Sequence, residues 1–235
     1  MTMTLRNCRF LGKFRWIVLC LVMVQFNSAS GVAQKKKETK GKSIDLLKIL
    51  GRGGRAAVQL KGKWRLEKGV LISPQLPVAK IQLPYTPPDE YDLTMTVEQT
   101  GPDEALALGI LVRGHRSSVF FDWHPRTTRR ILSGISLLDE SNDRNESITF
   151  GRHLVTDRES VVLVSVRNDG ETKSSITASV DGKKVVDWTG DPRRLSPSPS
   201  YFTPNKNALW ISCNTSYLIK KYELTPISGR GRVLR

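Results

Sequence analysis

Cysteine and histidine are scarce in this 235-residue chain, which contains three of each. Cys8 and Cys20 lie within the first 33 residues, so removal of that segment would leave Cys213 alone. A single cysteine cannot form an internal disulfide, so burial of apolar surface must stabilise the fold. The histidines are His115, His124 and His153. They are far apart and match no zinc-ligand spacing, so the sequence predicts no metal centre.

No apolar run is long enough to cross a bilayer, which needs about 20 residues. The run "WIVLCLVMV", residues 16–24, follows four basic residues without an acid and precedes the small, polar stretch "QFNSASGVAQ". This order is typical of a secretory signal peptide, with a cleavage site after Gly31-Val32-Ala33. The sequence predicts a signal peptide over residues 1–33, export to the periplasm, cell surface or medium, and no membrane-spanning segment.

Acidic residues are fewer than basic ones, 22 against 37, which gives a net charge of +15 at pH 7. The first 33 residues hold four basic residues and no acid, and residues 34–42, "QKKKETKGK", hold five lysines and one glutamate, so residues 43–235 keep +7. We interpret residues 34–42 as a solvated basic linker, with a docking arm for anionic surfaces as the alternative. Nucleic acid is not an expected partner, because no aromatic-interleaved binding motif is present.

Long amphipathic helices are missing, and apolar residues recur with the period of two that is typical of strands. In "YDLTMTVE", every second residue from 91 to 97 is apolar. Further strands are expected at 64–66, 70–73, 79–83, 106–112, 117–123, 131–137, 161–167, 174–181, 184–188, 209–213 and 217–224. Asp181-Gly182 predicts a type I′ hairpin turn, and "SIDLLKIL" predicts a short helix capped by Ser43. The pattern indicates one all-β domain, an antiparallel two-sheet sandwich, over residues 43–235.

Several segments carry a family resemblance: "GKWRLEKGVLIS", "AKIQLPYTPPDEYDLTMTVEQ", "VSVRN", "SITASVDGKKVVDWTGD" and "LWISCNTSYLIKKYELTPISGRG". Together they resemble the concanavalin A-like lectin/glucanase superfamily, and more narrowly its exported bacterial domains related to laminin-G-like and 3-keto-disaccharide hydrolase-type modules. The resemblance implies a two-sheet jelly roll, with polysaccharide as the commonest ligand class. Glucanases of this superfamily carry three acids at alternate positions of one strand. Here Glu90 and Asp92 are followed by Thr94, so the third acid is absent.

Glu90 and Asp92 are the candidates for a catalytic carboxylate pair. Residues i and i+2 of a strand share a face roughly 6.5 Å apart, which lies at the edge of the range for an inverting glycosidase. The alternative is a solvated strand entrance, because Pro87-Pro88-Asp89 immediately before them is typical of a turn.

Aromatic residues suggest a different kind of site. In "ALWISCNTS", Leu209, Ile211 and Cys213 form an apolar face, which places Trp210 with Asn214 on the opposite side. An indole among small polar groups suits a sugar ring, whose C–H face packs on the aromatic ring. In "SSVFFDWHP", the same alternation assigns Val119, Phe121 and Trp123 to the core and leaves a second group: Phe120, Asp122 and His124. The alternative is that Trp210 and Phe120 are covered by a loop.

Arginines could form a basic rim that favours an acidic polysaccharide. They are Arg113, Arg116, Arg126, Arg129, Arg130, Arg193 and Arg194. The loop "DESNDRNE", residues 139–146, is rich in oxygen ligands that calcium accepts, although it lacks a defined calcium-loop pattern and also suits an ordinary turn.

The sequence as a whole predicts an exported, non-catalytic, lectin-like module that binds a polysaccharide or cell-surface glycan through Trp210, Asn214, Phe120, Asp122, His124 and Arg113, without a cofactor. Two alternatives stay open. One is a glycoside hydrolase-type enzyme that uses Glu90 and Asp92, and the other is a structural cell-envelope protein without a small ligand.

Overall fold

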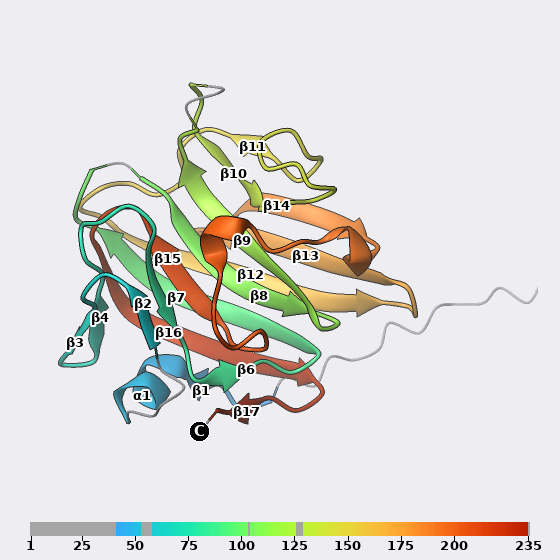
Figure 1. The fold of residues 1–235 in the computed structure, drawn as a ribbon, viewed down its shortest axis with the longest axis horizontal. Helices are drawn as coiled ribbons and strands as arrows, with labels where there is room; N and C mark the ends of the chain where they lie inside the picture. Colours follow the sequence, from blue (N-terminus) through green and yellow to red (C-terminus); the bar gives the residue numbers. More distant parts are fainter. Residues whose placement is uncertain (1–40, 53–57, 103, 126–128, 235) are drawn as a thin grey trace, which may run out of the picture. The chain divides into compact units, whose positions relative to one another are not determined.

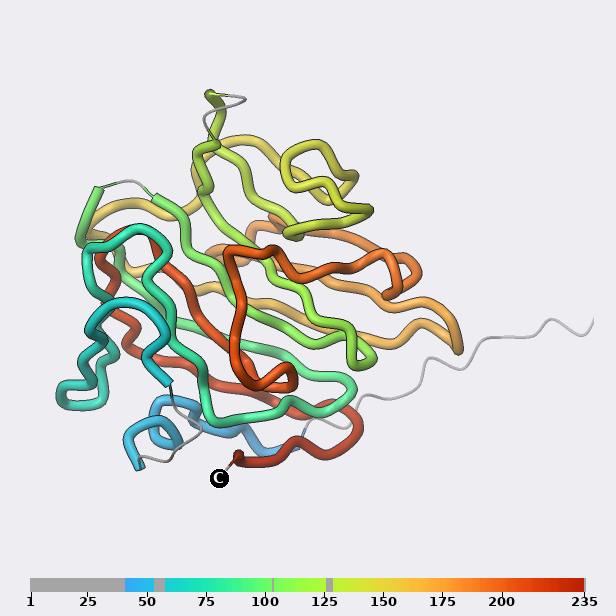
Figure 2. Tube along the Cα trace, in the orientation of Figure 1, coloured from blue at the N-terminus to red at the C-terminus, as the bar shows by residue number. Residues whose placement is uncertain are grey.

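The computed structural model describes residues 41–52, 58–102, 104–125 and 129–234. The expected signal peptide and nearly all of the expected linker lie outside these residues. Two large antiparallel sheets pack face to face, and a small two-stranded sheet lies at one edge (Figures 1 and 2). The expected all-β jelly-roll sandwich is confirmed. Among the described residues, no helix is long and apolar enough to cross a membrane.

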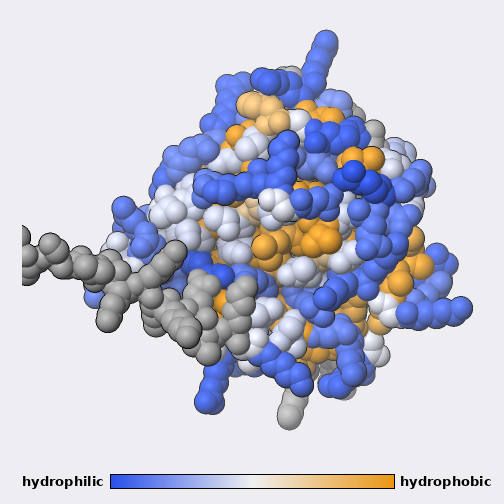
Figure 3. Space-filling view, turned by 180° about the vertical axis from the view of Figure 1, so that it is seen from behind, coloured by the Kyte–Doolittle hydropathy of each residue, from blue (hydrophilic) through white to orange (hydrophobic). Residues whose placement is uncertain are grey.

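The first sheet has eight strands. In spatial order they are β14 (Lys183–Gly190), β13 (Lys173–Val180), β12 (Glu159–Asp169), β7 (Glu90–Gln99), β16 (Tyr217–Ser228), β4 (Val70–Ile72) and β3 (Arg65–Glu67), with β1 (Ile44–Asp45) also paired to β16. Exposed apolar side chains on this sheet include Val161 and Leu163. Figure 3, the view from behind, shows apolar surface at the middle of that face.

The second sheet has seven strands. Their order is β11 (Thr149–Phe150), β10 (Leu132–Ile135), β9 (His115–Trp123), β8 (Leu106–Val112), β15 (Trp210–Cys213), β5 (Ala79–Gln82) and β2 (Val58–Lys61). The two-stranded sheet pairs β17 (Arg232–Val233) with β6 (Tyr85–Thr86). Most of the expected strands are present within one or two residues. Five short strands have no counterpart in the sequence pattern, because alternation cannot be recognised over so few residues: β1, β6, β11 and β17, with two residues each, and β2, with four.

The core lies between the two large sheets. On β7, Tyr91, Leu93, Met95 and Val97 are at most 1% exposed, and all belong to one apolar cluster that draws on both sheets. A second, smaller cluster of Ala107, Phe120, Leu132 and Trp210 is separate from it and belongs to the seven-stranded sheet. The seven-stranded sheet is therefore covered on both faces, by the core on one side and by the second cluster on the other.

The short helix forms where it was expected, but its cap differs. Helix α1 (Leu46–Gly51) begins after Asp45, whose carboxylate accepts the backbone N–H of Lys48 at 2.9 Å. The expectation of Ser43 as the cap was wrong, because Ile44 and Asp45 first pair with β16 and delay the helix by two residues. Ser43 instead donates its hydroxyl to Glu223.

Candidate functional site

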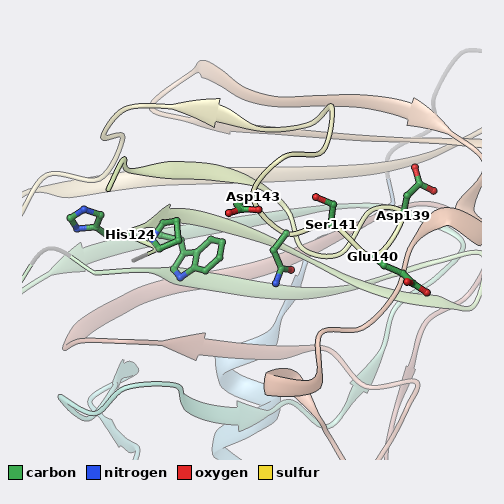
Figure 4. A pocket seen from close by; sticks show the side chains of 8 residues that line it. His124, Asp139, Glu140, Ser141 and Asp143 are labelled. Atoms are coloured by element: carbon green, nitrogen blue, oxygen red, sulfur yellow. The ribbon is translucent and has the colours of Figure 1, made fainter. Parts of the chain in front are cut away.

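Two adjoining hollows lie at one end of the seven-stranded sheet. The outer one, of about 710 Å³, is lined by Trp123, His124, Pro125 and residues 139–143. The inner one, of about 130 Å³, is lined by Val78, Phe120, Trp123, Ser136, Asn142, Ser198, Ser200, Tyr201 and Asn214. Trp123 and Asn142 border both, so the two hollows adjoin, and together we call them the depression. Figure 4 shows the outer hollow, with His124 toward one end, Asp139 and Glu140 toward the other, and Asp143 and Ser141 between them.

Trp123 is the central aromatic residue of this depression. Its ring is half-buried and meets Phe120 edge to face, with centroids 5.5 Å apart and planes at 82°. The strict alternation predicted Trp123 on the core side, and this was wrong. Asp122, which directly precedes Trp123, has a φ of 53°, and the pairing of β9 with β10 is irregular at this point. The alternation therefore breaks, and the side chain of Trp123 lies on the same side of the sheet as that of Phe120. Asp tolerates this left-handed conformation better than most residues do.

Asp122 supports the neighbouring loop from inside. The residue is 5% exposed, and its carboxylate accepts the backbone N–H groups of His153 at 3.0 Å and Leu154 at 2.7 Å. Burial raises the pKa of Asp122, and the two backbone hydrogen bonds oppose that shift. The side chain that was expected to face a sugar therefore holds residues 153–154 in place, and it does not line either hollow.

Trp210 is covered, as the second of the two interpretations above proposed. The residue is 3% exposed. On one side its indole lies over Gly109 of β8, so closely that a Cβ added there would stand 2.1 Å from Nε1. On the other side the ring of Tyr201 lies 4.6 Å away, centroid to centroid. Neither face of the indole is left for a sugar ring to pack on.

The remaining expected site residues fall into two groups. Asn214 lines the inner hollow, where its Oδ1 accepts the backbone N–H of Val78 at 3.0 Å, and His124 is exposed in the outer one. Arg113 lies elsewhere, because its guanidinium donates to Ser174 Oγ at 3.2 Å and to the carbonyl oxygens of Gly170 and Glu171. The depression thus unites Phe120, His124 and Asn214, and it excludes Asp122, Arg113 and Trp210.

Most of the expected arginine rim is engaged locally. Arg193 pairs with Asp191, and Arg194 pairs with both Asp139 and Glu146. Hydrogen bonds from Arg194 hold the pKa of Asp139 and of Glu146 below their usual range. Arg116 donates to Thr203 Oγ1 at 2.6 Å. Arg130 lies 3.7 Å over the ring of Phe150, and Arg126 is outside the described residues. The positive charges of Arg193 and Arg194 are therefore offset by acids before any ligand arrives.

Glu90 and Asp92 lie on the other sheet and face away from the core. Asp92 Oδ1 forms an ion pair with Arg167 at 2.7 Å, and Glu90 Oε1 accepts the backbone N–H of Asn168 at 2.8 Å. Both partners belong to β12, the strand next to β7. Neither acid lines the hollows at the far sheet. The two carboxylates thus serve to join adjacent strands, and the structure offers no support for a catalytic pair there.

The oxygen-rich loop 139–146 is held by protein contacts. Asp139 and Glu146 bind Arg194, Glu146 also accepts the indole N–H of Trp188 at 2.8 Å, and the Asn145 amide donates to the carbonyl oxygens of Ile135 and Ser141. Within the described part of the chain, no group of three or more His, Cys, Asp or Glu is placed to hold a metal ion.

Sequence reasoning missed Trp123, Asn142, Ser198, Ser200 and Tyr201. Trp123 was assigned to the core by alternation. The other four lie on loops, where no periodic pattern reports their orientation. The run "SPSPSYF" does not signal which ring is covered, because Tyr201 lies against Trp210 whereas Phe202 next to it is 67% exposed.

No family model and no curated protein sequence matches the chain at a significant level. Solved structures do match. One of them comes from work on the endo-acting O-glycanases that prominent members of the human gut microbiota express to initiate mucin breakdown. That chain is 9% identical to this one, the match covers 81% of this chain and 100% of that chain, and the TM-score is 0.50.

A protein of unknown function with a galectin-like fold from Bacillus subtilis is 10% identical over 84% of this chain and 98% of its own, with a TM-score of 0.47. The carbohydrate-recognition domain of Emp47p is 13% identical over 83% of this chain and 99% of its own, also with a TM-score of 0.47. At these identities the likeness concerns the fold. The chain has an antiparallel two-sheet jelly-roll fold of the concanavalin A-like type.

Proposed function

We propose that this chain is an exported, non-catalytic module that binds glycan in the depression around Trp123. The observation that carries the proposal is the composition of that depression: a half-buried indole on an aromatic base, surrounded by the amides of Asn142 and Asn214 and the hydroxyls of several serines. A sugar ring offers an apolar C–H face to an aromatic ring and hydroxyls to amide and hydroxyl groups. Concave sites with an apolar lining and a few polar groups are the usual places for small ligands.

The charge of the site favours a neutral over an acidic saccharide. Asp139, Glu140 and Asp143 border the outer hollow, and Asp139 is paired with Arg194, which offsets part of that negative charge. An acidic polysaccharide would therefore bring its own negative charge toward carboxylates. A neutral ligand should bind with little dependence on salt. The acidic ligand expected from the sequence would instead bind more weakly as the salt concentration rises.

The test is binding of the mature chain, residues 34–235, to xylan, mixed-linkage β-glucan, dextran, galacturonan and a sulfated galactan, at low and at high salt. We expect binding of at least one neutral polymer with little salt dependence and no release of reducing sugar. Release of reducing sugar would favour the hydrolase alternative, and no binding to any glycan would favour the envelope-protein alternative.

Trp123→Ala is the variant that locates the site. Loss of a central aromatic contact is expected to weaken binding at least about tenfold, the effect of a strong interface residue. Phe150→Ala is the matched control, because it removes another ring of the same sheet that is 51% exposed and lines neither hollow. Near-UV circular dichroism checks that both variants fold. A folded Trp123→Ala protein with unchanged affinity would place the site elsewhere.

A further inference from the structure

Residues 195–207, which we call the strap, cross the outer face of the seven-stranded sheet. Lys80 of β5 donates its ammonium to the carbonyl oxygen of Ser200 at 2.9 Å, and Arg116 of β9 donates to Thr203 Oγ1. β15 and β8 lie between those two strands in the sheet. The strap is therefore held by side chains from strands on both sides of β15 and β8. Figure 1 shows this orange segment in front of the sheet, and it includes the single turn η2 (Pro199–Tyr201).

The strap is packed onto the outer face of the seven-stranded sheet. Tyr201 covers Trp210, and Thr203 is fully buried. The backbone N–H of Asn205 binds Gln82 Oε1 at 3.0 Å, and Gln82 itself is 1% exposed. The polar residues of the sheet beneath include Ser118 and Ser212, each at most 2% exposed. The chain thus occupies this face with its own residues.

The strap also forms a wall of the inner part of the depression. Ser198, Ser200 and Tyr201 form one wall of the inner hollow, and Trp123 and Asn142 connect it to the outer hollow. The inner volume of about 130 Å³ is well below the roughly 300 Å³ at which sites for larger ligands begin. A single sugar residue can insert part of its ring there, and a second residue cannot follow it.

We infer that the site binds the end of a glycan chain. The terminal sugar packs against Trp123 and the strap, and the rest of the glycan leaves past His124. The inference rests on the proposed function. An internal segment needs a groove that is open at both ends, and the strap blocks one end. The amides of Asn142 and Asn214 and the hydroxyls of Ser136 and Ser198 surround the terminal ring, where they can bind its hydroxyl groups.

The length dependence of binding tests this inference. Each polymer of the panel is shortened by limited endo-hydrolysis to a series of mean lengths, and binding to the mature chain is measured by titration calorimetry at equal polymer mass. For an end-binding site, tenfold shortening raises the number of sites per gram about tenfold, and each chain binds one protein whatever its length. Several proteins on each long chain, with capacity per gram unchanged by shortening, would overturn the inference and leave the proposed function standing.

Absence of binding to every polymer and every shortened series counts against the proposed function itself, so the two failures are distinguishable. Tyr201→Ala tests the closed end directly. It removes the ring at the wall and is expected to weaken binding of the shortened chains at least tenfold. Phe202→Ala is the matched control, since its neighbouring ring is 67% exposed, and we expect less than a twofold change. A folded Tyr201→Ala protein that binds short chains as the wild type does would also overturn the inference.

Discussion

Leu163 and Val164 are neighbours in the middle of β12, and they face opposite sides of the sheet. Val164 is fully buried and is paired in the sheet with Leu93 and Ala178, whereas Leu163 is 36% exposed and is paired with Thr94 and Ser179. Successive residues of a strand point to opposite faces, so a one-residue step changes the environment from core to solvent.

Val164→Asp should therefore unfold the protein, whereas Leu163→Asp should not. Burying an unpaired carboxylate in the core is expected to cost about 4 kcal/mol or more, and the same change on the outer face about 1 kcal/mol or less. Urea denaturation followed by tryptophan fluorescence measures both. Equal stability of the two variants would mean that the faces of β12 are wrongly assigned.

At the scale of elements, three hairpins are closed by two-residue turns with positive φ at both positions, and in the one between β3 and β4 Lys68 and Gly69 have φ of 48° and 84°. Asp181 and Gly182 have φ of 50° and 78°, which confirms the expected turn between β13 and β14. Arg113 and Gly114, between β8 and β9, have φ of 48° and 78°. The turn at Arg113 was not expected, because arginine does not favour the left-handed region. Contacts of the Arg113 guanidinium with residues 170–174 hold Arg113 in this conformation.

Substitutions at Gly182 test whether the positive φ or the space around the residue limits which side chains this turn accepts. No heavy atom lies within 4 Å of a Cβ added at this position, so a substitution causes strain only through the backbone. Gly182→Ala is expected to cost about 1 kcal/mol. Gly182→Asn adds more atoms and should cost less, because asparagine tolerates the left-handed region. Thermal unfolding of both variants gives the order, and a larger loss for asparagine would show that a contact, rather than φ, decides.

At the scale of the whole molecule, one core without a disulfide stabilises both sheets. Cys213 of β15 is the cysteine that the mature chain would retain, and it is 1% exposed in the cluster between the sheets. Burial raises the pKa of its thiol to about 12. Since the reactive form is the thiolate, both exposure and ionisation of Cys213 depend on opening of the core.

Cys213 should therefore report global unfolding. In the mature chain at pH 8 we expect no reaction with a chromogenic disulfide reagent over hours, and one thiol per chain in denaturant. Across a denaturant series, the labelling rate should follow the unfolding transition seen by circular dichroism. Rapid reaction of the native protein would indicate local opening at β15 and a core less continuous than the structure has it.

The sequence by itself determined the strand content, the type of sandwich, the Asp-Gly hairpin and the core side of β7 and β12, because these depend on local alternation and on turn residues whose conformational preferences are intrinsic. Placement of the candidate site was decided by the tertiary structure. A single positive φ at Asp122 turned Trp123 toward the side of the sheet on which Phe120 lies. Contacts from β5 and β9 brought a Pro- and Ser-rich loop across the sheet and covered Trp210. Both events depend on residues far apart along the chain, and a periodic pattern reports which face a side chain takes but not which loop will cover that face.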